Sequence, residues 1–214
     1  MTQNEPQDGA TRHPVPHGSL RREAKVHAAT VAGARRPMRR ADREVLDPTQ
    51  IADILQQSHV VHVAYEDAEG QTVVPVNFAY EYRPYAPNDY DADGRGRRGE
   101  LTLYMHSALE GRKVDAIRAA GNALPVAFEM DCDQVIYTGR TPCASSTAFR
   151  SLVGTGTASL MEDGPAKRDV LTMLATRLDR EPSRPFTDRQ AGTVAVWRID
   201  SGSFPAKHHP LSAL

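Results

Sequence analysis

The segment HSALEGRK, residues 106–113, combines the residue types that can bind a phosphate group. Ser107 and Glu110 stand three residues apart, which is the spacing of a capping box, so we expect a helix to begin at Ser107. The first backbone N–H groups of a helix carry partial positive charge and are a common binding site for anions. Arg112 and Lys113 add two full positive charges within the next turn.

Two interpretations of this segment are open from the residues alone. Cations at a helix N-terminus oppose the helix dipole, and a bound anion would remove that cost while gaining charge-assisted hydrogen bonds. Gly111 also favours a ligand, because a residue without a side chain lets the ligand approach the backbone closely. The other interpretation is a solvated basic patch on an amphipathic helix, with no ligand.

The elements that position this segment are a mixture of strands and helices. Asp47 before Pro48 is a good N-cap followed by proline at the first helical position, which predicts a helix over residues 48–57. Runs of β-branched or alternating apolar residues predict strands, and amphipathic spacing predicts two more helices. The expected strands are 59–65, 72–82, 100–106, 124–131, 148–161 and 192–200, and the other expected helices are 107–120 and 163–178.

The order of these elements predicts the fold. The strands follow one another in hairpins, so we expect a mostly antiparallel sheet and the α+β class. Six strands are enough for a small Greek-key barrel with flanking helices. Pro75 has no N–H group to donate to a sheet ladder, so its strand is expected to be unpaired or bulged at that position.

The composition excludes several classes of protein. The 214 residues carry 26 Lys and Arg against 27 Asp and Glu, so the chain is not a strongly basic nucleic-acid-binding domain. No apolar run approaches the roughly 20 residues of a membrane span, and the start lacks the apolar segment of a secretory signal. Cys132 and Cys143 are too few for a disulfide framework or a Cys-rich zinc site. We expect a cytoplasmic protein that contacts neither membrane nor nucleic acid.

Basic residues gather at the start of the chain. Residues 1–40 hold eight basic and three acidic residues, whereas the remainder holds 18 basic and 24 acidic ones. Residues 1–37 show no helix or strand periodicity, so we expect a disordered basic tail followed by one domain over 38–214. Arginines of the tail could contact nucleic acid or an acidic partner. No Phe, Tyr or Trp is interleaved to stack bases, which favours a solvated leader.

Residues 89–100 match the calcium-binding loop pattern in their acidic residues and central glycine. Three arginines lie within the loop, and no pair of helices flanks it. The pattern therefore favours a solvated hairpin tip, and we expect no bound metal.

Five segments occur in an order and spacing that extend over residues 38–200. They are MRRADREV (38–45), VVPVNFAY (73–80), LYMHSALEGRKVDAIRAAGNALPVAFEMD (103–131), FRSLVGTGTASL (149–160) and VAVWRID (194–200). With these segments the chain resembles the FMN-binding split-barrel superfamily of pyridoxamine 5′-phosphate oxidase, and within it the nitroimidazole-resistance protein group. The resemblance implies a six-stranded antiparallel split barrel and a homodimer with FMN in clefts between its subunits.

The resemblance also implies a set of residues around FMN. Arg112 and Lys113 would hold the phosphate, beside the strand end at His106 and Ser107. Arg150 stands at the arginine of a family Tyr-Arg-Ser-Val element, in which this chain has phenylalanine in place of tyrosine. The expected cofactor-binding residues are Val74, Pro75, Val76 and Asn77 at the isoalloxazine edge, with His106, Ser107, Gly111, Arg112, Lys113 and Arg150.

The resemblance implies an FMN-dependent oxidoreductase that passes electrons from a reduced nicotinamide to a small organic acceptor, such as a nitro compound. In that reaction His106 is the candidate catalytic residue, because an imidazole can donate a proton to a reduced substrate. Alternatively, His106 only hydrogen-bonds the cofactor. The alternative function is a non-catalytic flavin or haem carrier or sensor of the same fold.

Overall fold

The computed structural model describes residues 38–85, 99–178 and 184–211. The predicted tail over 1–37 and most of the calcium-like loop lie outside the described residues. The strands of the described part are β1 (Glu44–Val45), β2 (Val60–Asp67), β3 (Gly70–Asn77), β4 (Ala79–Arg83), β5 (Glu100–Ser107), β6 (Leu124–Tyr137), β7 (Ser146–Leu160), β8 (Ala195–Ser203) and β9 (Ala206–His209). Its α-helices are α1 (Pro48–Gln57), α2 (Arg112–Ala119), α3 (Gly164–Arg177) and α4 (Asp188–Ala191).

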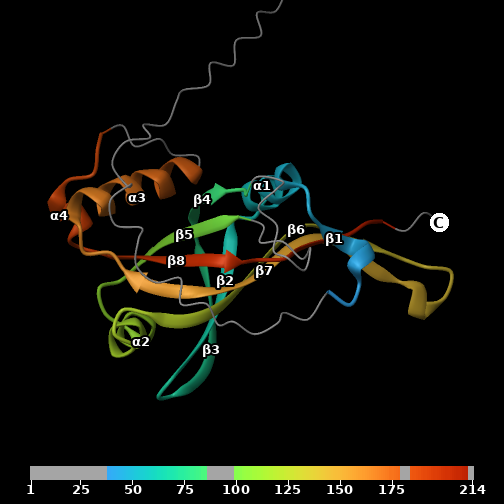
Figure 1. Cartoon of the computed structure of the whole chain (residues 1–214), viewed down its shortest axis with the longest axis horizontal. Helices are drawn as coiled ribbons and strands as arrows, with labels where there is room; N and C mark the ends of the chain where they lie inside the picture. The colour runs from blue at the N-terminus through green and yellow to red at the C-terminus, as the bar shows by residue number, and fades with distance from the viewer. Residues whose placement is uncertain (1–37, 86–98, 179–183, 212–214) are drawn as a thin grey trace, which may run out of the picture.

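The nine strands of the described part form one antiparallel sheet (Figure 1). Its order is β3-β2-β6-β7-β8-β5-β4, and β9 pairs with both β1 and β7. β3 contacts β5 without pairing with it, so the sheet curls toward itself but does not close.

The predicted α+β class and antiparallel sheet are confirmed, and the expected count of six strands is wrong. The strand expected over 72–82 is divided at Phe78 into β3 and β4. β1 and β9 add two strands that are too short to show an alternating pattern of their own. These three additions account for the larger sheet.

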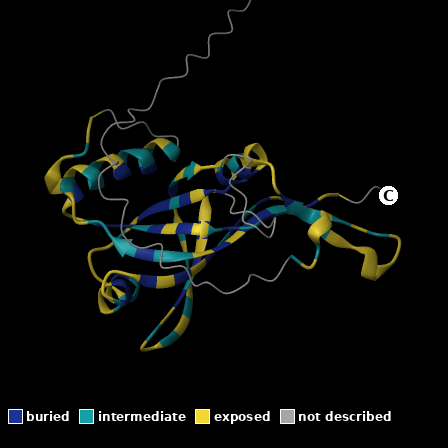
Figure 2. Cartoon of the chain, viewed as in Figure 1, coloured by how far each residue is buried: buried dark blue, intermediate teal, exposed yellow. Residues whose placement is uncertain are grey.

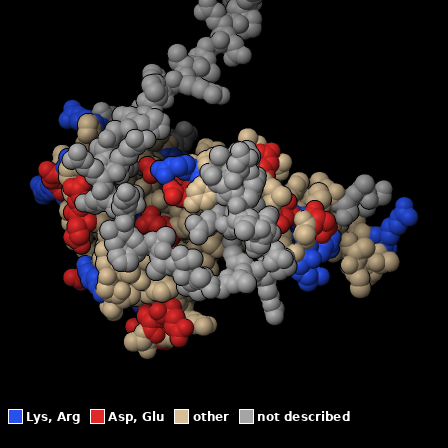
Figure 3. All heavy atoms as spheres, in the orientation of Figure 1, with Lys and Arg blue, Asp and Glu red and all other residues tan. Residues whose placement is uncertain are grey.

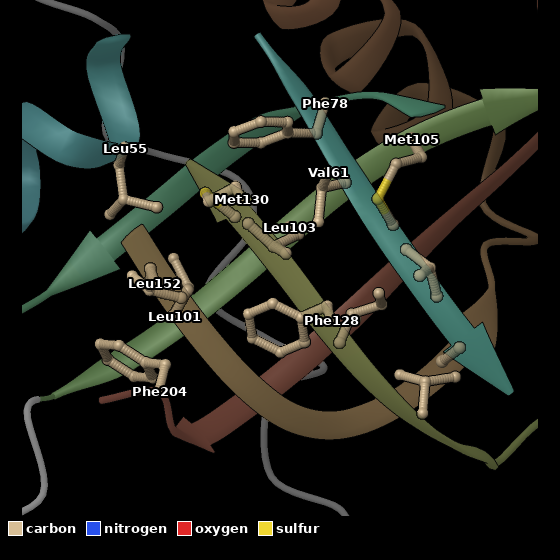
Figure 4. Packing of buried hydrophobic residues seen from close by; sticks show 14 of the residues in the cluster. Leu55, Val61, Phe78, Leu101, Leu103, Met105, Phe128, Met130, Leu152 and Phe204 are labelled. Atoms are coloured by element: carbon tan, nitrogen blue, oxygen red, sulfur yellow. The ribbon is translucent and has the colours of Figure 1, made fainter. Parts of the chain in front are cut away.

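Burial alternates along the strands and places one side of the curled sheet in the core (Figure 2). Leu101, Leu103 and Met105 of β5 are buried on this side, as the period of two in a strand requires. Figure 4 shows them packed with Phe128 of β6 and Phe204. Burial of this apolar surface is the main force that holds the strands together.

Gly154 of β7 lies opposite Phe128 of β6 in the strand ladder. A Cβ atom added at Gly154 would collide with the Phe128 ring. The glycine therefore makes room for a large core side chain in a curved strand.

The helices lie around this sheet. α1 has the predicted bounds, and the Asp47 side chain caps it by accepting a hydrogen bond from the backbone N–H of Thr49 at 2.8 Å. α3 packs Val170 and Leu174 into a second buried cluster with Tyr104 of β5. No helix within the described ranges is long and apolar enough to cross a membrane.

Pro75 is a correction to the sequence analysis. It lies opposite His62 in an unbroken β2–β3 register, so the strand is neither unpaired nor bulged there. β3 lies at the end of the strand order and pairs with β2 alone. Proline is tolerated on such an edge strand, because its missing N–H group can face away from the partner.

The start of the second helix is also corrected. α2 begins at Arg112 rather than at Ser107, and its N-cap is Gly111 at a φ of 124°. Ser107 instead pairs with Ala195 of β8 as the last residue of β5. The capping box predicted from Ser107 and Glu110 is therefore not formed.

Candidate functional site

The predicted phosphate-binding segment connects β5 to α2 at one end of the sheet (Figure 1). His106 and Ser107 lie opposite Val196 and Ala195 of β8, and this pairing fixes the end of β5. The chain then passes through exposed residues 108–111 before α2 begins. The segment is therefore open to solvent and is not covered by the described core.

The first turn of α2 has the features of an anion site. The backbone N–H of Asp115 donates to the carbonyl oxygen of Gly111 at 3.0 Å, which closes the first turn. No side-chain hydrogen bond caps the helix at Gly111. Open space surrounds the position where a Cβ atom of Gly111 would stand, although its positive φ would strain any other residue. A phosphate could accept hydrogen bonds from the uncapped N–H groups of this turn.

Arg112 is bound by the turn between β2 and β3. Its Nε donates to Oδ2 of Asp67 at 2.7 Å, and its Nη2 donates to Oδ1 of the same carboxylate at 2.8 Å. Nη2 also donates to the carbonyl oxygen of Gly70 at 2.9 Å. This ion pair lowers the pKa of Asp67 and raises the pKa of Arg112. A bidentate arginine–carboxylate pair is stronger and more specific in its geometry than a hydrogen bond between neutral groups.

Lys113 follows Arg112 in the first turn of α2 and is half-buried. Its Nζ is 5.1 Å from the ring centre of Trp197, a fully buried residue of β8. Burial lowers the pKa of the Lys113 ammonium group. The contact is a cation–π interaction that holds the side chain close to β8.

His106 is exposed at the end of β5. With the described residues its side chain forms no hydrogen bond or ion pair. Its imidazole is therefore available to a ligand, but no described carboxylate orients it as a general acid.

The predicted isoalloxazine edge lies on β3. Val74 and Val76 are partly buried and pack against the core, whereas Pro75 and Asn77 are exposed on the other face. The Asn77 side chain donates to the carbonyl oxygen of His59 at 3.1 Å. Among the described strands β3 pairs with β2 alone, so the backbone groups of its other edge have no strand partner in the described part of the chain and can meet a ligand.

A shallow hollow of about 480 Å³ lies along the β2–β3 hairpin. It is lined by Ala64, Tyr65, Glu66, Gln71, Thr72 and Val73, which flank Asp67 and Gly70 in sequence. This volume is within the range of small-molecule sites. The hollow and the Arg112 ion pair therefore share one hairpin.

Arg150 does not join this group. It pairs with Cys132 in the β6–β7 ladder. Eight residues, or about 26 Å of strand, separate it from Ala158 near the other end of β7. Its Nη1 is 2.5 Å from Oδ2 of Asp53 in α1, and its Nε donates to Oδ2 of Asp133 at 2.6 Å. Within one chain the predicted site residues thus form two separate groups.

Asp67 and Gly70 are the site residues that sequence reasoning missed. They contact Arg112 across 45 and 42 residues of chain, respectively. No motif or spacing connects residues so far apart, so only the folded chain shows the relationship.

The chain is similar to a known protein family and to solved structures. The family model of pyridoxamine 5′-phosphate oxidase matches residues 47–208. No curated protein matches the chain in sequence.

Three solved structures of similar fold have different descriptions. A candidate 5-nitroimidazole antibiotic resistance protein from Bacteroides thetaiotaomicron is 25% identical, with a TM-score of 0.57 over 77% of this chain and 85% of that one. An FAD and haem binding protein from Mycobacterium smegmatis is 18% identical, with a TM-score of 0.60 over 80% and 77% of the two chains. The flavocytochrome Anf3 from Azotobacter vinelandii is 18% identical, with a TM-score of 0.63 over 84% and 75%.

Proposed function

The chain belongs to the pyridoxamine 5′-phosphate oxidase family, whose model matches residues 47–208, and from this membership we propose that it is a flavoprotein that binds FMN. The observation that carries the proposal is the uncapped start of α2, where open space surrounds the Cβ position of Gly111 and the next residue is Arg112, whose guanidinium is fixed by Asp67. These groups fit a phosphate, because they offer backbone N–H donors and a fixed cation on one exposed surface.

Different residues at this end of the sheet would bind different parts of FMN. The first turn of α2, with Arg112 and Lys113, would hold the phosphate. The unpaired edge of β3 at Val74–Asn77 would lie along the isoalloxazine ring. His106 would hydrogen-bond the ligand or hold a proton near it, and its exposure at the strand end supports either role.

We propose a homodimer with the ligand between its subunits. A partner would cover exposed apolar side chains of the sheet. Val60 of β2, Val73 of β3 and Val153 of β7 are 37%, 61% and 50% exposed. Arg150 supports the same arrangement, because its distance from α2 along β7 lets it serve a ligand held mainly by the other subunit.

The activity we propose is that of an oxidoreductase acting on a small organic molecule. The chemistry that FMN supplies is the transfer of electrons from a reduced nicotinamide to an acceptor such as a nitro compound. The protein contributes binding, orientation and a solvent-exposed imidazole. The likeness in fold to a 25%-identical candidate nitroimidazole resistance protein supports this class of acceptor.

A non-catalytic flavin or haem carrier is the second candidate. It is favoured by similar folds, of which one is described as an FAD and haem binding protein and another as a flavocytochrome. For a flavin carrier the proposed ligand site is the same, and only turnover differs.

Anaerobic reduction distinguishes the two candidates. FMN-loaded protein is mixed with NADH or NADPH, and its visible absorption is followed before and after addition of a nitroimidazole. An oxidoreductase loses its flavin bands with the donor and regains them with the acceptor. A carrier keeps its flavin bands unchanged, and a Soret band on addition of haemin identifies a haem protein.

A further inference from the structure

The ion pair between Asp67 and Arg112 joins the β2–β3 turn to the start of α2. We propose that Asp67, with the carbonyl group of Gly70, positions Arg112 for the ligand phosphate, so that this turn determines the preference for phosphorylated flavins. The inference rests on the proposed flavin site and adds to it a positioning residue outside the predicted set.

The hydrogen bonds of Arg112 define which part of its side chain is available. A guanidinium has five N–H donors, one on Nε and two on each terminal nitrogen. The donor of Nε binds Asp67, and the two donors of Nη2 bind Asp67 and the carbonyl of Gly70. The contacts with described residues therefore leave the two donors of Nη1 for a ligand.

Burial supports this division of the side chain. The Asp67 side chain is 12% exposed, whereas that of Arg112 is 35% exposed. Oδ1 of Asp67 also accepts the backbone N–H of Glu69 at 2.9 Å, so the carboxylate is fixed by its own turn. Arg112 is thus held at its inner edge by a rigid acceptor while its outer end remains accessible.

The surroundings of Arg112 explain why positioning is needed. Acidic side chains gather over the β2–β3 turn, at the lower end of the molecule in Figure 3. Oε2 of Glu69 lies 3.8 Å from Nε of Arg112, and its side chain is 74% exposed. Without Asp67, Glu69 would be the remaining acidic partner of Arg112 at this turn, and its exposed side chain is less constrained than that of Asp67. The buried carboxylate of Asp67 therefore fixes the guanidinium more firmly than Glu69 can.

The test is a double-mutant cycle on ligand preference in the full chain. Dissociation constants for FMN and riboflavin are measured by flavin fluorescence for the wild type, Asp67→Asn, Arg112→Ala and the double variant. We expect Asp67→Asn to lower the preference for FMN over riboflavin about tenfold, the equivalent of one charge-assisted hydrogen bond. In the Arg112→Ala background the same substitution has no further effect, because Asp67 acts through Arg112.

Two more variants separate positioning from general electrostatics. Glu100→Gln removes a negative charge from the other end of β5, where Glu100 pairs with Arg83, and is expected to leave the preference unchanged. Asp67→Glu keeps the carboxylate and is expected to retain most of the preference. An unchanged or increased FMN preference in Asp67→Asn overturns the inference. A wild-type protein that binds neither flavin contradicts the proposed function itself, which is a different result.

Discussion

The guanidinium of Arg177 stacks on the ring of Phe78, with its central carbon 4.7 Å from the ring centre. Its Nη2 donates to the backbone carbonyl of Ser58 at 2.5 Å and to that of Leu55. These carbonyl groups lie at the C-terminal end of α1, where helical hydrogen bonds run out. Arg177 therefore connects α3 to α1 and satisfies backbone groups that would otherwise be buried without partners.

We expect Arg177→Met to lower the free energy of unfolding by about 3 kcal/mol, because each hydrogen bond from a charged group contributes about 1.5–3 kcal/mol. Urea denaturation followed by circular dichroism measures the change. Arg83→Met is the matched control, since Arg83 is 77% exposed and pairs only with the exposed Glu100 among described residues. Equal stability of the two variants would show that Arg177 does not join the helices.

Gly154→Ala is expected to destabilise the protein by about 1–3 kcal/mol, the usual cost of overpacking a core. The added methyl group would collide with the ring of Phe128. Gly202→Ala is the control, because nothing lies within 4 Å of its added Cβ atom. Differential scanning calorimetry compares the two melting temperatures. If Phe128→Leu fails to relieve the cost in the double variant, the collision is not its cause.

The pH dependence of stability has a definite sign at Asp67. Its hydrogen bonds with Arg112 lower its pKa in the folded state below the ordinary value. Stabilisation by the ionised carboxylate is therefore complete above about pH 4 and is lost as the pH falls through the lowered pKa. Urea midpoints of the wild type and Asp67→Asn should differ at pH 7 and converge toward pH 2. A constant difference across this range would contradict the assignment.

The helices and strands that could be predicted from the sequence are those whose formation depends on nearby residues. Asp47 and Pro48 fix the start of α1, and the alternation of Leu101, Leu103 and Met105 identifies β5. The start of α2 was predicted wrongly because the backbone of Ser107 pairs with β8, and this long-range pairing overrides the local capping signal. Local residues cannot reveal which distant strand lies alongside.

The candidate site shows the same limit. The HSALEGRK segment identified the exposed connection between β5 and α2. The partner of Arg112 could not be predicted, because Asp67 reaches it only after β2 and β3 have paired and folded back. Likewise, the separation of Arg150 from α2 follows from the β6–β7 register, which the residues themselves do not display.

Removal of both candidate phosphate ligands should affect the two flavins differently. Arg112→Ala combined with Lys113→Ala is expected to weaken FMN binding by about 100- to 10,000-fold, since each of the two lost charge-assisted hydrogen bonds is worth about 1.5–3 kcal/mol. Riboflavin lacks the phosphate and should be weakened much less. Fluorescence titration of both ligands checks the difference. Equal weakening of both would place the phosphate elsewhere in the protein.

FMN binding at the α2 start is tested by a titration of the full-length wild-type protein with FMN and with riboflavin, followed by flavin fluorescence. We expect saturable binding of one FMN per chain, with riboflavin at least tenfold weaker because it cannot use the α2 start and Arg112. A protein that leaves the fluorescence of FMN unchanged, or that binds the two flavins equally, would contradict this expectation.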